Sequence, residues 1–139
     1  MNDLRNYLKT SFNKSVLFDT GLIVDFLVGD PKTRLFFEDF VFSGHLTPVI
    51  SAQTVCELFA AARNTKEESH LNYWLTNVFD VVEITYEIGK RAGLMKRNSG
   101  IYLGDAIIAS TSILLGIPLV TTRPELYRKT DIRIFRPYS

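Results

Sequence analysis

The feature that most limits how this chain can fold is the alternation of short apolar runs with longer segments of helical spacing. The runs are rich in β-branched residues and bounded by turn-forming residues, as strands are. They cover residues 16–18, 46–50, 81–84, 118–121 and 132–135. Strands separated by helices are typical of a parallel sheet with helices on its faces. We therefore expect an α/β fold, a three-layer α/β/α sandwich around a mostly parallel, five-stranded sheet.

The length of the chain fits one such unit. A chain of 139 residues falls within the usual size of a single domain, and a hydrophobic fraction of 46% is enough for a full core. We expect residues 1–139 to form one domain. Within it, residues 1–15 are an extension in which Leu4 and Leu8 have the spacing of a short packing helix.

Hydroxyl residues mark two of the expected turns from strand to helix. Ser51 follows the second apolar run and Thr85 follows the third, and both types are preferred N-caps. Residues 64–79 form a further expected helix, with a charged start and an apolar later half.

Composition excludes several classes of protein. Cys56 is the only cysteine, which rules out an internal disulfide framework and is typical of a reducing compartment. Neither an apolar signal segment nor a run of about 18 apolar residues is present. His45 and His70 are isolated and lack zinc-site spacing. We expect a cytoplasmic protein with no membrane partner. Its net charge of +1 neither requires nor excludes a nucleic acid.

Asp105 is the strongest single indication of a site. It is the only formally charged residue between residues 98 and 122, and apolar side chains surround it on nearly the whole circumference of an expected buried helix. An ionised carboxylate in such surroundings needs a compensating charge, a metal ion or a raised pKa. The alternative is that Asp105 only stabilises the first turn of its helix.

Glu57 lies on the helix expected after the second strand. Its inward face is expected to consist of Ala52, Val55, Phe59 and Ala62, so Glu57 points the other way. Its neighbours at helical spacing are small or uncharged, whereas a merely solvated face usually collects charges. This pattern indicates the wall of a cleft, although an ordinary exposed glutamate remains an alternative.

Asp19 ends the first expected strand, and open α/β sheets bind ligands beyond the carboxyl ends of their strands. An aspartate before Thr20 could equally be the N-cap of the next helix. The tripeptide Asp-Thr-Gly is also found in aspartic proteases, but their fold is all-β and this chain has helical periodicity throughout.

Three carboxylates from separate strand–helix units can converge at one edge of the sheet. Asp19, Glu57 and Asp105 would offer the oxygen-rich surroundings that Mg²⁺ or Mn²⁺ prefers. Clusters of this kind commonly serve phosphodiester hydrolysis. A phosphoacceptor receiver-like module also has an acid after its first strand, but it needs an Asp at the end of the third strand, which this chain lacks.

Residues 16–136 resemble the PIN-domain family, and especially the VapC-type toxins of toxin–antitoxin pairs. The resemblance is carried by segments 16–27, 50–63 and, most closely, 103–122. The positions that match the family's motifs are the three acids Asp19, Glu57 and Asp105 and the hydroxyl residues Thr20 and Thr121.

The chain departs from the family pattern after Thr121. The family usually carries a further acid there, in a short loop before a Phe or His, and these positions fall on Arg123 or Leu126. Glu125 is the nearest substitute, out of register, so a second metal position is in doubt. Gly21 also stands where the family often has Asn or Ser.

The resemblance implies a ribonuclease that hydrolyses RNA with Mg²⁺ or Mn²⁺ held by Asp19, Glu57 and Asp105. It also implies a small antitoxin that inserts a segment into the acidic cleft, and a homodimer. Arg123 is the first candidate for a phosphate contact. Further candidates, each equally explained as a solvated charge, are Lys96, Arg97, Arg128, Lys129, Arg133 and Arg136. The alternative is a degenerate PIN domain that binds RNA or a protein without cleavage.

Overall fold

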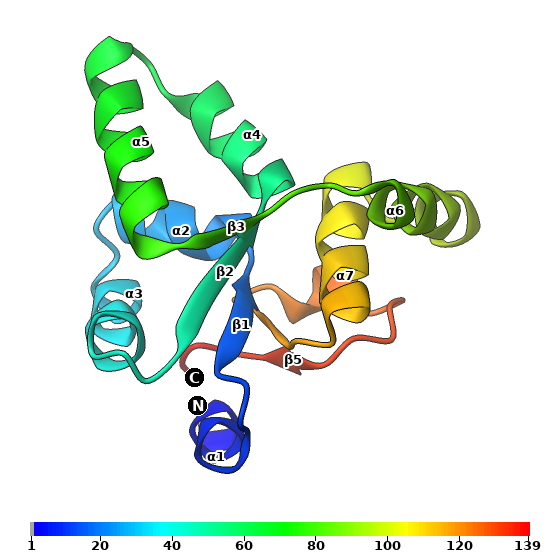
Figure 1. Cartoon of the computed structure of the whole chain (residues 1–139), viewed down its shortest axis with the longest axis horizontal. Coiled ribbons are helices and arrows are strands. Elements are labelled where there is room, and N and C mark those ends of the chain that lie inside the picture. The colour runs from blue at the N-terminus through cyan, green and yellow to red at the C-terminus, as the bar shows by residue number, and fades with distance from the viewer. Residues whose placement is uncertain (1) are drawn as a thin grey trace.

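The computed structural model describes residues 2–139 and shows a five-stranded sheet with helices on both faces (Figure 1). The strands lie in the order β3-β2-β1-β4-β5. All four strand pairs are parallel, and Leu17 is in register with Val49 on one side and with Leu119 on the other. The strands are β1 (Ser15–Phe18), β2 (Thr47–Ser51), β3 (Asp80–Val82), β4 (Leu119–Val120) and β5 (Ile134–Phe135).

Helices fill the connections between strands, as the sequence predicts. They are α1 (Asn2–Thr10), α2 (Thr20–Leu27), α3 (Pro31–Phe36), the π-helix η1 (Phe37–Phe42), α4 (Ala52–Ala61), α5 (Thr65–Val78), α6 (Tyr86–Ser99), α7 (Leu103–Leu115) and the 3₁₀ helix η2 (Pro124–Tyr127). The expected caps are confirmed, because Ser51 Oγ accepts from the Gln53 amide and Thr85 Oγ1 accepts from the Ile88 amide. Among residues 2–139, no helix has the length and apolar character needed to span a membrane.

The alternation of side chains along β1 separates two hydrophobic cores. Val16 and Phe18 belong to the larger core, which α1, α2, α3, η1 and α5 help to form, while Leu17 belongs to the smaller core under α7. Phe18 is the centre of an aromatic cluster in the larger core, with its ring centroid 5.6 Å from that of Phe37 and 5.8 Å from that of Phe79. Both faces of the sheet are therefore covered, which confirms the three layers.

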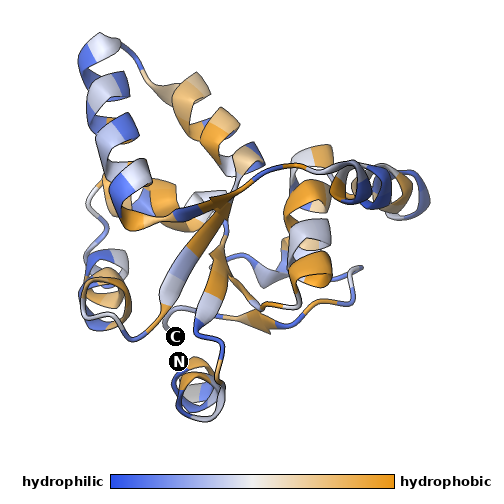
Figure 2. Ribbon diagram, viewed as in Figure 1, coloured by the Kyte–Doolittle hydropathy of each residue, from blue (hydrophilic) through white to orange (hydrophobic). Residues whose placement is uncertain are grey.

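The expected orientation of α7 is only partly right. Leu103, Leu114 and Leu115 are 41–50% exposed, although apolar residues on nearly every side predicted a fully buried helix. The buried face instead includes Thr111 and Ser112, together with Ser110. The hydroxyls of Thr111 and Ser112 donate to backbone carbonyls, which satisfies them inside the core. Figure 2 shows the resulting mixture of apolar and polar residues along this helix.

The expected inward face of α4 is rotated. Thr54 and Leu58 are its fully buried side chains, whereas Val55 and Phe59 are only partly buried. The reason is that α4 packs against α2, where the Thr54 and Thr20 hydroxyls lie 2.8 Å apart. This packing brings the start of α4 beside the carboxyl end of β1.

Candidate active site

The candidate site lies where the direction of strand addition reverses. From β1 the chain adds β2 and β3 on one side, and then crosses to add β4 and β5 on the other. Loops that leave neighbouring strands in opposite directions open a crevice at their carboxyl ends, where open α/β sheets bind ligands. Asp19 directly follows β1 and Thr121 directly follows β4, so both lie at this position.

Asp19 is held from inside the protein. Its side chain is 5% exposed, and each carboxylate oxygen accepts a hydrogen bond from a buried hydroxyl. Thr121 Oγ1 donates to Oδ2 at 2.7 Å, and the Tyr127 hydroxyl donates to Oδ1 at 2.9 Å. Although the Asp19 backbone occupies the N-cap position of α2, its side chain makes no capping hydrogen bond. The capping alternative therefore does not explain why an acid stands here.

Glu57 reaches the same edge of the sheet from α4. Its side chain is exposed, and its Oε1 accepts a hydrogen bond from Thr20 Oγ1 at 2.9 Å. Thr20 is the first residue of α2 and follows Asp19 directly. One hydroxyl thus connects the second acid to the strand end that carries the first.

Asp105 is the third residue of α7 and is half-buried. Burial, followed by the negative charges of Asp19 and Glu57, raises the pKa of Asp105 to about 6, while Arg123 lowers it. These influences require all three acids to lie near one another. The residue before it, Gly104, allows α7 to begin close to α4, since a Cβ there would lie 2.9 Å from Gln53 Nε2.

The positions after Thr121 are less regular. The Arg123 backbone amide donates to Thr121 Oγ1 at 3.0 Å, and its exposed side chain lies near enough to Asp105 to lower the pKa of that acid. Glu125 is exposed in η2 and is not among the charges that most affect Asp105. Its role stays a prediction. At Gly21 an added Cβ would meet nothing within 4 Å. The Asn or Ser side chain that the family often has at this position is therefore absent, and no neighbouring side chain fills its space.

Several basic residues named as phosphate contacts are engaged elsewhere. The Arg133 guanidinium lies 4.8 Å from the ring centroid of Tyr7, at the amino end of β5 and therefore away from the acids. Lys129 Nζ donates to the Ser99 carbonyl, and Lys96 Nζ donates to the Ile101 carbonyl. Arg123 is left as the basic side chain that the structure places beside the acids.

Tyr127 is the functional residue that the sequence analysis missed. It is 1% exposed at the end of η2, and burial together with the Asp19 and Asp105 carboxylates raises the pKa of its hydroxyl above the ordinary value. The hydroxyl therefore keeps its proton at neutral pH and donates to Asp19. The only signal in the sequence was that this Tyr ends the irregular loop after Thr121.

The donor set suits a hard divalent cation. Three carboxylates near one another, with Arg123 as the nearby positive charge, leave an excess of negative charge and offer only oxygen ligands. Their side chains do not enclose a finished site, because no three Asp, Glu, His or Cys residues between residues 2 and 139 are close enough to share an ion. Holding a cation therefore requires the exposed Glu57 and the half-buried Asp105 to turn toward Asp19.

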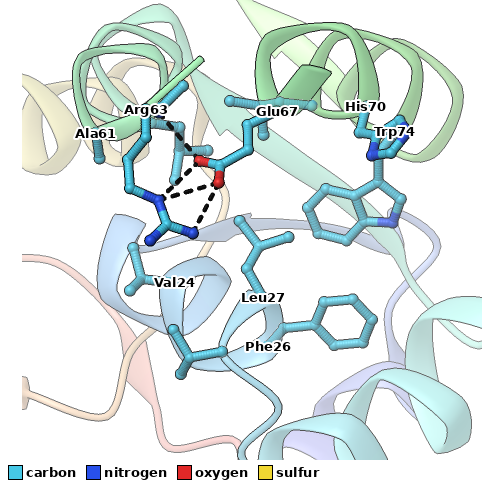
Figure 3. A pocket seen from close by; sticks show the side chains of 12 residues that line it. Val24, Phe26, Leu27, Ala61, Arg63, Glu67, His70 and Trp74 are labelled. Carbon is cyan, nitrogen blue, oxygen red and sulfur yellow. Dashed lines mark hydrogen bonds and ion pairs between the residues drawn. The ribbon is translucent and has the colours of Figure 1, made fainter. Parts of the chain in front are cut away.

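A large apolar groove lies between α2, α4 and α5 (Figure 3). Its volume is about 720 Å³, and its walls include Val24, Leu27 and Trp74. Arg63 and Glu67 form an ion pair of 2.8 Å at this groove. Because α2 also carries Thr20 and α4 also carries Glu57, the groove and the acidic site share two of their helices.

Comparisons with known proteins support the same fold. A chain in a toxin–antitoxin complex from Klebsiella pneumoniae is similar with a TM-score of 0.74 and 23% identity, over 89% of this chain and 98% of that one. A chain of FitAcB from Neisseria gonorrhoeae is similar with a TM-score of 0.68 and 20% identity, over 88% of this chain and 97% of that one. A chain of VapBC-1 from nontypeable Haemophilus influenzae is similar with a TM-score of 0.71 and 21% identity, over 88% of this chain and 98% of that one. Among curated proteins the comparison found no significant match.

The PIN-domain family model matches residues 16–132, a range that contains every acid and hydroxyl of the candidate site. PIN domains are nucleases, so the match also supports the expected class of enzyme, a hydrolase. The parallel sheet, the three acids at its carboxyl edge and this match agree, and the chain belongs to the PIN-domain family.

Proposed function

We propose that the protein is a Mg²⁺- or Mn²⁺-dependent endoribonuclease and the toxin of a toxin–antitoxin pair, acting in the cytoplasm. The observation that carries this proposal is the gathering of three carboxylates at the carboxyl edge of a PIN-domain sheet, where burial, and then the charges of Asp19 and Glu57, raise the pKa of Asp105 to about 6. Acids that repel one another in this way gain stability from a cation between them.

Asp19, Glu57 and Asp105 would hold the metal ion directly or through water. When bound, the ion supplies an activated water and stabilises negative charge on the phosphate. Asp19 is fixed for this task by two buried hydroxyls, and Thr20 orients Glu57. Arg123 binds a phosphate of the RNA and offsets its repulsion from the acids. Hydrolysis forms one bond from the water oxygen to phosphorus, breaks the bond to the leaving ribose oxygen, and returns a proton to that oxygen.

The proposal is tested by cleavage of a structured RNA with Mg²⁺, Mn²⁺ or EDTA. Asp105→Asn is expected to lose cleavage, since its amide offers weaker ligation and no charge. Asp3→Asn is the matched control, because Asp3 is an exposed acid on α1, outside the site. Equal cleavage by the wild type and by Asp105→Asn would refute the assignment of this acid, and cleavage that persists in EDTA would refute metal dependence.

A PIN domain that binds RNA without cutting it is the second candidate. Two observations favour it: Glu125 is not among the charges that most affect Asp105, and no three potential ligands among residues 2–139 enclose an ion. RNA that binds the protein and stays intact in saturating Mn²⁺, with no difference between the wild type and Asp105→Asn, would establish this candidate in place of the enzyme.

We propose that the antitoxin binds in the apolar groove between α2, α4 and α5 and reaches the acids from there. The groove exposes Val24 and Leu27, which are 40% and 45% exposed, and an apolar face of a small partner would cover them. The solved structures with the same fold include a toxin–antitoxin complex. Chain continuing from the groove past Thr20 and Glu57 would end in the acidic site.

The proposal predicts a small protein encoded next to this chain, and that protein is the partner to test. Leu27→Asp is expected to weaken its binding at least about tenfold, because it buries a charge in the groove, and to leave RNA cleavage by the free chain unchanged. Phe12→Asp is the control, since Phe12 is fully exposed outside the groove. Equal weakening by both variants, or by neither, would contradict this placement.

A homodimer is the expected oligomeric state. Sedimentation of the purified chain at micromolar concentration should give twice the mass of 15.8 kDa. A single species with the monomer mass would contradict the expectation without affecting the proposed site, because all three acids come from one chain.

A further inference from the structure

Tyr127 has no role in the expected metal site, yet it makes one of the two hydrogen bonds that hold Asp19. Its side chain is 1% exposed and its ring lies in the smaller core under α7. A Phe at this position would fill the core equally well. The hydroxyl is therefore not needed for packing. It donates to Asp19 Oδ1 and also lies close enough to Asp105 to lower the pKa of that acid.

The two hydroxyl donors define the orientation of the Asp19 carboxylate. Thr121 donates to Oδ2 and Tyr127 donates to Oδ1, so rotation of the carboxylate would break both hydrogen bonds. An ionised carboxylate has about four lone-pair positions, of which these donors occupy two. One position on each oxygen is left for a cation on the side away from the donors.

The donors also limit how many cations the site can hold. The Tyr127 hydroxyl donates to Asp19 Oδ1 on the inner side of the carboxylate, and a cation cannot share the position that this donor occupies. The next acid along the chain, Glu125, is exposed. Both Asp19 oxygens thus have one lone-pair position on the inner side taken by a donor, which leaves no free Asp19 position there for a second ion.

We propose that Tyr127 is a positioning residue that fixes Asp19 as a ligand for a single divalent cation, at a place where a further acid would otherwise recruit a second one. This inference rests on the proposed function, since it assumes that the acids bind Mg²⁺ or Mn²⁺. Tyr127 acts through Asp19 and does not touch the substrate.

The test is titration of the metal-free full-length chain with Mn²⁺ alone, followed by calorimetry. The wild type is expected to bind one ion per chain. Tyr127→Phe keeps the ring and removes the hydroxyl, and it should weaken Mn²⁺ binding about 10–100-fold, as the loss of a residue that supports a metal ligand commonly does. Excess Mn²⁺ should restore most of the RNA cleavage by this variant.

Tyr138→Phe is the matched control. The Tyr138 hydroxyl also lies within hydrogen-bond distance of a Thr and an Asp, 2.8 Å from Thr33 Oγ1 and 3.5 Å from Asp30 Oδ2, but both lie outside the acidic site. This variant should bind Mn²⁺ as tightly as the wild type. Unfolding of both variants by urea in EDTA separates loss of metal affinity from loss of structure.

Thr121 supplies a second, independent variant. Thr121→Val removes the other donor to Asp19 and should weaken Mn²⁺ binding in the same direction, whereas Thr121→Ser keeps a hydroxyl and should not. Equal Mn²⁺ affinity in Tyr127→Phe and the wild type, or two ions per chain in the wild type, would overturn the positioning role alone. A wild-type chain that binds no Mn²⁺ would overturn both this inference and the proposed function.

Discussion

The inner and outer halves of the acidic site are built in different ways. In the inner half, Asp19 is 5% exposed, and Thr121 and Tyr127 hold both of its oxygens. In the outer half, Glu57 is exposed and has one hydroxyl partner, while Asp105 is half-buried. In the proposed metal site, one ligand would therefore be fixed before any cation arrives, and the other two would adjust to the ion.

This difference explains how the chain tolerates three acids in one place. A buried carboxylate is stable when donors surround it, and Asp19 has two. Asp105 instead carries the cost, since burial, and then repulsion from Asp19 and Glu57, raises its pKa to about 6. In the proposed site, the inner half fixes the orientation of the Asp19 carboxylate, and the outer half adds the unneutralised negative charge that attracts a cation.

The largest expected effect is on catalysis and does not distinguish the two halves. Asp19→Asn and Glu57→Gln should each lower RNA cleavage about 10³-fold, because each removes a ligand whose contribution to the barrier is about 4 kcal/mol. Single-turnover cleavage in saturating Mn²⁺ measures both. If Glu57→Gln cleaved at the wild-type rate, the outer half would lose its proposed ligand and the comparison would fail.

Stability should distinguish the halves. Thr121→Val is expected to lower the free energy of unfolding by about 2 kcal/mol, because it leaves a buried Asp19 oxygen without its donor. Glu57→Gln should change it by less than about 0.5 kcal/mol, because water replaces the lost contact at an exposed side chain. Urea unfolding in EDTA gives both values, and similar losses in the two variants would show that Asp19 is not held more firmly than Glu57.

The pH dependence of stability should isolate Asp105. Its pKa is raised from 3.8 to about 6 in the folded chain, so its ionisation opposes folding. The resulting loss in the free energy of unfolding is absent below about pH 3.8, grows as pH rises toward 6, and stays constant above pH 6. Asp105→Asn should therefore stabilise the metal-free chain at pH 7 by about 1 kcal/mol, a value reduced for solvent screening of a half-exposed group. It should not do so at pH 3.5.

Urea unfolding of the wild type and Asp105→Asn across this range makes the measurement. Acids distant from Asp105 contribute equally to both chains, so the difference between the chains reports Asp105 together with its interactions with Asp19 and Glu57. A difference that does not change with pH would mean that the pKa of Asp105 is not raised in the folded chain.

The smallest effect is expected at Arg123, whose exposed side chain belongs to the outer half. Arg123→Gln should weaken RNA binding a few-fold and reduce the slope of log affinity against log salt concentration by about 1, as the loss of one phosphate contact does. Lys9→Gln on α1 is the control. The slope is measured from RNA binding by the inactive Asp105→Asn chain, with and without each change. An unchanged slope in Arg123→Gln would show that Arg123 does not contact an RNA phosphate.

The fold could be predicted from the sequence because its signals are local. All five apolar runs are strands, and the caps at Ser51 and Thr85 are present. The ends of the strands were less predictable, since the pairing partner decides where a strand stops: the run 132–135 contains the two-residue strand Ile134–Phe135. The burial of α7 was also misjudged, because exposed leucines depend on what lies beside the helix and not on its own pattern.

The candidate acids could be found from sequence because each stands in surroundings that do not suit an isolated charge. The supporting contacts could not. Tyr127 and Asp19 are separated by 108 residues, and no spacing rule connects a hydroxyl in a loop with the end of a distant strand. The same holds for the approach of Gly104 to Gln53, which depends on how two helices pack.

The separation between these partners also determines when the site exists. Asp19 emerges early from the ribosome, but its two donors follow 102 and 108 residues later, and β4, its neighbour in the sheet, arrives with them. Contacts this distant form late, and domains fold as units. The candidate site of a nascent chain is therefore incomplete until Thr121 and Tyr127 have been made and folded. If the proposed cleavage of RNA is right, this delay protects the messenger and the ribosome that are still producing the chain.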